Sequence, residues 1–128
     1  MPVVTLEEYQ QILQDFEKRF LPFKKNLESL NDQFMDMLIS KYTKKTAHKH
    51  TSNVELFIIY LESSKDIFDL KDLSKGKLNS QFRAWCRSKV WNADSDHEIK
   101  TSLKKFFKFV ASLTNEYEVE AKRILLLL

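Results

Sequence analysis

The amino-acid sequence predicts an all-α protein, folded as a compact bundle of about five to six helices. Apolar residues recur at spacings of three and four along most of the chain, which is the period of a helix buried on one side. Only one Gly and two Pro occur among the 128 residues, whereas hairpin-rich sheets need many more turn residues. A hydrophobic fraction of 43%, with ten Phe, suffices for one packed core.

The N-terminal part predicts two consecutive helices. The first is expected over residues 5–20, because Thr5 and Glu8 have the spacing of a capping box at the start of an apolar stripe. Pro22 is expected to end this stretch, since proline disfavours helical geometry in the residue before it. A second helix then runs to about Lys41.

The middle of the chain predicts two more helices with a loop between them. Thr43 is the expected N-cap of the third helix and Ser74 that of the fourth. The charged and polar stretch Ser63–Leu73 predicts a loop with one helical turn at most. The residues expected to face the core are Ala47, Val54, Phe57, Ile58 and Leu61 in the third helix and Leu78, Phe82, Trp85 and Cys86 in the fourth.

The C-terminal part predicts a turn at 91–94 and a capping box formed by Ser95 and Glu98. A fifth helix follows, and Asn115 is expected to begin a final one. The inward residues of the fifth helix are Ile99, Leu103, Phe106, Phe107 and Val110.

Basic charge is concentrated in two segments. Residues 41–60 carry a charge of +3 and residues 81–110 carry +4, against +3 for the whole chain. Positive charge confined to particular helices is what a polyanion-binding surface requires. The alternative is that these lysines form solvated faces that keep a Phe-rich bundle soluble.

Five segments share their residue pattern with one known family. They are Lys44–Thr46, Asn53–Leu61, Leu70–Leu73, Phe82–Trp85 and Thr101–Val110. On these residues the chain from about 27 to 113 resembles the core-binding, SAM-like N-terminal domain of tyrosine recombinases and phage integrases. The block 82–91 also resembles small, stand-alone bacterial proteins of unassigned function that carry this domain alone.

The length of 128 residues predicts one domain, 1–128. The resemblance divides it into an N-terminal helical extension (1–26), a core-binding-like bundle (27–113) and a C-terminal helix (114–128). It implies a non-catalytic module that grips the phosphates of duplex DNA through two basic helices. The expected DNA-binding residues are Lys44, Lys45, Thr46, Lys49, Arg83, Arg87, Lys100, Thr101, Lys104, Lys105 and Lys108. The alternative is a protein-interaction or oligomerisation module of the same fold, whose interface is formed by the acidic N-terminal helices and the leucine tail.

No enzyme, cofactor or metal site is expected. The catalytic domain of full-length recombinases carries an Arg, His, Arg and Tyr constellation, and Tyr117 has no such partners here. His48 and His50 diverge around a helix and cannot share one metal ion. The lone Gly76 excludes the usual nucleotide-binding loops, and Cys86 is expected to be a buried structural thiol.

Ile124, Leu125, Leu126, Leu127 and Leu128 form the longest apolar run. Five consecutive apolar residues cannot all face one core from one helix, so this tail is expected either to fray or to form a homo-oligomer interface. The sequence shows no signal peptide and no run long enough to span a membrane. With the single cysteine, this predicts a cytoplasmic protein without a membrane or small-molecule partner.

Overall fold

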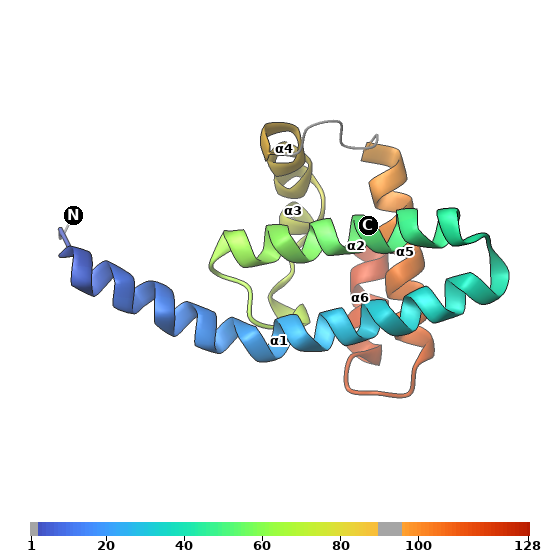
Figure 1. Ribbon diagram of the computed structural model, residues 1–128, viewed down its shortest axis with the longest axis horizontal. Helices are drawn as coiled ribbons and strands as arrows, with labels where there is room; N and C mark the ends of the chain where they lie inside the picture. Colours follow the sequence, from blue (N-terminus) through green and yellow to red (C-terminus); the bar gives the residue numbers. More distant parts are fainter. Residues whose placement is uncertain (1–2, 90–95) are drawn as a thin grey trace.

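The computed structural model describes residues 3–89 and 96–128. Its elements are α1 (Leu6–Lys41), α2 (Lys44–Ser64), the 3-10 turn η1 (Leu70–Asp72), α3 (Lys75–Leu78), α4 (Ser80–Lys89), α5 (Asp96–Ser112) and α6 (Glu118–Leu127). These two ranges contain helices and loops but no strand, so the predicted all-α class is confirmed (Figure 1). Within them, no helix is both long and apolar enough to cross a membrane. The expected turn at 91–94 and the cap at Ser95 lie outside the described residues.

The predicted helix break at Pro22 is wrong, because α1 continues through it for 36 residues. An internal proline removes one backbone hydrogen bond and crowds the preceding turn, at a cost of about 3 kcal/mol. Phe20 and Phe23, on either side of it, are buried and meet edge to face at 5.8 Å between ring centroids. Burying both rings offsets that cost, and the helix bends instead of ending (Figure 1).

Helices α1 and α2 form an antiparallel hairpin, and α5 and α6 cross it (Figure 1). The hairpin turns at Tyr42 and Thr43, which end α1 and begin α2. The Thr43 hydroxyl accepts a hydrogen bond from the Thr46 amide at 3.2 Å, so the predicted N-cap is confirmed. A cap at this point lets α2 start immediately after α1.

Aromatic rings join four helices in the core. Phe57 of α2 contacts Phe82 of α4 at 5.2 Å and Phe107 of α5 at 6.2 Å. Phe34 of α1 meets Phe106 of α5 at 5.5 Å. All residues predicted to face inward from the middle helices and α5 are buried, except for the half-buried Trp85.

The predicted fourth helix is divided in two. Ser74 caps α3 as expected, accepting from the Lys77 amide at 3.2 Å, but Asn79 leaves helical geometry before α4 begins. The Asn79 side-chain amide donates to the carbonyls of Lys75 and Leu127, each at 2.9 Å. The interruption therefore serves as the attachment point for the end of α6. The predicted loop before Ser74 contains one short turn, η1, as expected.

Helix α6 is attached to the rest of the molecule by the half-buried side chain of Arg123. The Arg123 guanidinium donates to the carbonyls of Leu70 and Leu73 at 2.9 and 3.0 Å. The predicted start of this helix at Asn115 is wrong, because α6 begins at Glu118; the Asn115 side chain instead accepts from the Tyr117 amide in the preceding turn at 2.9 Å. The helix thereby closes over η1.

The C-terminal apolar run packs mainly against the chain's own core. Ile124 is fully buried, Leu125, Leu127 and Leu128 are half-buried, and Leu126 is 88% exposed. Of the residues 124–128, Leu126 is therefore the one whose side chain is exposed to a partner. The tail's expected role as an oligomer interface stays a prediction.

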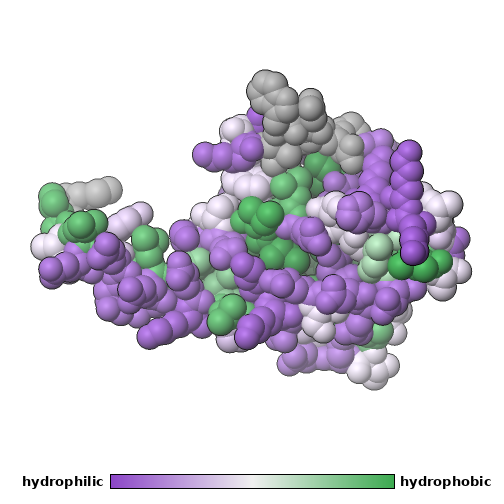
Figure 2. Space-filling model, in the orientation of Figure 1, coloured by the Kyte–Doolittle hydropathy of each residue, from purple (hydrophilic) through white to green (hydrophobic). Residues whose placement is uncertain are grey.

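At its other end the chain projects beyond the bundle (Figure 1). We call residues 6–15 of α1 the N-terminal arm; all are exposed except the half-buried Leu13. Apolar side chains gather at the free end of this arm (Figure 2). The arm lies within the predicted N-terminal extension.

Phe57→Ala is expected to destabilise the fold by about 3–5 kcal/mol, because it removes the ring that joins α2, α4 and α5 and leaves a cavity. Urea unfolding followed by far-UV circular dichroism measures this loss. Ile59→Ala is the control, since Ile59 lies on the same helix but is 55% exposed, and its cost should stay within about 0.5 kcal/mol. Equal costs for the two variants would contradict the assigned core.

Candidate nucleic-acid interface

Three lysines lie along one side of α5. Lys100, Lys104 and Lys108 follow one another at four-residue spacing, opposite the buried face of this helix. Lys104 and Lys108 are exposed and Lys100 is half-buried. Eight residues of helix rise about 12 Å, so the three amines follow a line of roughly that length.

None of these three lysines forms an ion pair with a carboxylate among residues 3–89 and 96–128. Other basic residues do: Lys24 pairs with Glu62 at 3.0 Å, Lys77 with Asp66 at 3.0 Å and Lys122 with Glu118 at 2.9 Å. Like charges at this spacing destabilise a helix slightly unless a counter-ion is present. The α5 lysines therefore form a row of uncompensated positive charge.

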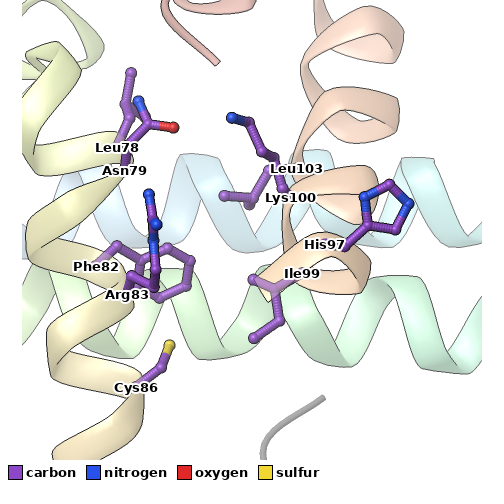
Figure 3. Close-up of a pocket in the computed structure, with 9 residues that line it drawn as sticks. All are labelled: Leu78, Asn79, Phe82, Arg83, Cys86, His97, Ile99, Lys100 and Leu103. Atoms are coloured by element: carbon purple, nitrogen blue, oxygen red, sulfur yellow. The ribbon is translucent and has the colours of Figure 1, made fainter. Parts of the chain in front are cut away.

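A cleft of about 170 Å³ lies between α4 and the N-terminal half of α5 (Figure 3). Its lining residues are Leu78, Asn79, Phe82, Arg83, Cys86, His97, Ile99, Lys100 and Leu103. Lys100 extends towards α4, while the His97 ring points away from it (Figure 3). Apolar side chains form the floor of the cleft, and Arg83 and Lys100 are among its basic groups. The residues described as lining it include no carboxylate.

A groove of about 420 Å³ lies near the other end of α5, beside the turn between α1 and α2. Lys41, Lys105 and Lys108 line it, and Lys105 Nζ lies 3.4 Å from the Tyr42 hydroxyl. This lining also contains no described carboxylate. By contrast, two grooves along α1 contain carboxylates. One is lined by Glu28, Asp32 and Glu55 with Lys24, and the other by Glu17 and Glu62 with Lys18 and Lys24.

The lysines of α2 join this surface only in part. Lys44 and Lys45 are exposed in the first turn, and neither forms an ion pair among the described residues. Lys49 instead pairs with Glu98 of α5 at 3.2 Å. The two predicted basic helices are therefore in contact. Lys49, one of the residues predicted to bind phosphate, already forms an ion pair with Glu98.

The remaining predicted DNA-binding residues differ in their surroundings. Arg83 and Arg87 are exposed one turn apart on α4. The Thr101 hydroxyl donates to the backbone carbonyl of its own helix at 2.8 Å. The Thr46 hydroxyl accepts from Thr43 at 3.1 Å and keeps its own proton for another acceptor.

A polar cluster that the sequence did not reveal joins α2 to α5. The Ser102 hydroxyl lies 2.7 Å from His50 Nδ1 and accepts from the Asn53 side chain at 2.9 Å. Ser102 is fully buried, and its hydroxyl also donates to the Glu98 backbone carbonyl of the same helix at 3.2 Å. The sequence feature that could have indicated this cluster is that Asn53 and Ser102 lie next to the apolar stripes of their helices.

The environment of His50 disfavours its charged form. Burial lowers its pKa below 6.5, and the nearby charges of Lys105 and Lys49 lower it further. The cluster therefore favours the neutral imidazole at neutral pH.

Among the described residues, no group of three or more His, Cys, Asp or Glu side chains is arranged to hold a metal ion. A comparison of the chain with protein-family models, curated proteins and solved structures found no match. The recombinase resemblance accordingly rests on the sequence segments alone, and the function must be argued from the site itself.

Stability is expected to fall as the pH drops from about 7.5 to about 5.5, because the unfolded chain then binds a proton that folded His50 binds less readily. The contribution is present above pH 6.5 and is lost below it. Urea midpoints at the two pH values measure this slope. His50→Gln should flatten it, whereas His48→Gln, at an exposed position two residues earlier, should leave it unchanged. An unaltered slope in His50→Gln would contradict the assignment.

Proposed function

We propose that this protein is a non-catalytic helical module that binds the phosphate backbone of duplex DNA through α5. The observation that carries the proposal is the row of uncompensated lysines, Lys100, Lys104 and Lys108, with a carboxylate-free depression at each end. The recombinase resemblance supports the same choice of ligand.

A row of lysines suits phosphates better than it suits a single small anion. Duplex DNA carries one negative charge per about 1.7 Å of its axis, so a line of about 12 Å meets several phosphates at once. Each lysine that replaces condensed counter-ions contributes entropy, and mutual repulsion on the free helix is relieved. Lys41 and Lys105, in the groove at the end of α5, extend the line towards the turn between α1 and α2.

The proposed contacts predict little sequence specificity. Lysine amines neutralise phosphates as point charges, and phosphate contacts fix the position of a protein without reading bases. Arg83 and Arg87 on α4 are the side chains with the planar geometry that base edges require. We place them at the border of the interface, next to the cleft.

Lys104→Glu combined with Lys108→Glu is expected to abolish duplex binding, since these are the two exposed members of the row. The unaltered chain should bind mixed-sequence duplexes with an affinity that falls with salt at a log–log slope of about −3.6 if four phosphates are contacted. Fluorescence anisotropy at several salt concentrations measures both quantities.

The matched control is Lys18→Glu combined with Lys25→Glu, which makes the same change in net charge at exposed positions on α1. This variant should keep most of the affinity. An equal loss of affinity in both variants would show that net charge alone governs binding and would contradict the assigned row. Absence of binding by the unaltered chain at low salt would overturn the proposal.

A further inference from the structure

The N-terminal arm continues the apolar stripe along which the rest of α1 packs on the bundle; we call this stripe the seam. Apolar residues alternate at spacings of three and four along α1, at Leu6, Tyr9, Leu13, Phe16, Phe20, Phe23, Leu27, Leu30 and Phe34. This is the a and d pattern of a helix that packs lengthwise on another helix. From Phe16 onward every member is buried in the bundle, whereas Leu6 and Tyr9 are 71% and 52% exposed. The seam therefore extends about two turns beyond its partner within the chain.

The positions beside the seam are uncharged in the arm. Gln10 and the 55% exposed Ile12 take the e and g places that flank a helical partner. The acidic residues Glu7, Glu8 and Asp15 lie at outer positions of the heptad. Two such arms can therefore pack together without opposing like charges, while a partner with charged flanks would gain no ion pairs here.

The bundle itself restricts how a second helix can lie on the arm. At Phe16 the seam side is already covered, with Phe68 at 5.4 Å and the Lys65 amine at 4.6 Å from that ring. A parallel partner would bring its own bundle to this same end and collide. An antiparallel partner ends its arm there and keeps its bundle at the far end.

We propose that the N-terminal arm is a self-association element, in which the arms of two copies of this chain pack antiparallel about a two-fold axis. Tyr9 of each copy then lies against Leu13 of the other, and both apolar ends are covered. Such an interface is self-complementary, as a two-fold dimer requires. Because it is smaller than a standard interface of about 1,600 Å², the dimer should dissociate on dilution. This proposal does not depend on DNA binding.

Sedimentation equilibrium over a range of protein concentrations tests the association. The unaltered chain should approach twice its mass of 15.2 kDa, and Leu6→Ser combined with Tyr9→Ser should return it to a monomer. The replaced side chains are exposed, so the bundle should keep its thermal midpoint. Gln11→Ser combined with Gln14→Ser alters outer positions of the same arm and should leave the dimer intact. A monomer at every concentration, or equal dissociation in both variants, would overturn the proposal.

Oxidative cross-linking tests the orientation. Tyr9→Cys combined with Leu13→Cys should give a covalent dimer, since these positions face each other between antiparallel arms. Leu6→Cys alone should not, because the two copies of this residue lie about 15 Å apart in that arrangement. The unaltered chain, whose Cys86 is buried in the bundle, gives the background level of cross-linking. Cross-linking through Leu6→Cys would overturn the arrangement, because a parallel pair in register brings the two copies of Leu6 together as well as those of Tyr9 and Leu13.

Discussion

The burial of two adjacent rings on α5 is the constraint on which the rest of the structure depends. Phe106 packs on Phe34 of α1 and Phe107 on Phe57 of α2, so one turn of α5 contacts both helices of the hairpin. Two contacts at this spacing fix the rotation of α5 about its axis. That rotation turns the lysine row outward and places Ser102 against α2. The candidate interface is thus positioned by the same rings that stabilise the fold.

Polar contacts between α2 and α5 then determine which basic residues remain available. The buried hydroxyl of Ser102 binds His50 and Asn53, which fixes how the two helices lie against each other. In this arrangement Glu98 reaches Lys49 and neutralises it. Basic charge lies in residues 41–60 and 81–110 of the sequence. In the folded chain Lys49 is neutralised, Lys44 and Lys45 stay exposed at the start of α2, and Lys100, Lys104 and Lys108 form a row on α5.

Helix α1 serves two purposes along a single seam. Its buried part supplies the aromatic floor of the bundle, and the packing of Phe20 and Phe23 holds it together through Pro22. On the N-terminal side of Phe16 the same apolar spacing continues, but Leu6 and Tyr9 are exposed and are not covered by residues 3–89 or 96–128. Dimerisation through this arm would place two lysine rows in one particle, and binding of both rows to one duplex would raise its apparent affinity.

The sequence by itself determined the helical class, the caps at Thr43 and Ser74 and the inward faces of the middle helices and α5, because local spacing and side-chain hydrogen bonds decide these features. It could not determine that α1 passes through Pro22, since only the tertiary burial of the flanking Phe20 and Phe23 offsets the cost of an internal proline. Nor could it show that Lys49 is paired while Lys104 is not, or that Ser102 meets His50. Those outcomes depend on the crossing of α2 and α5, and only tertiary packing fixes how two helices cross.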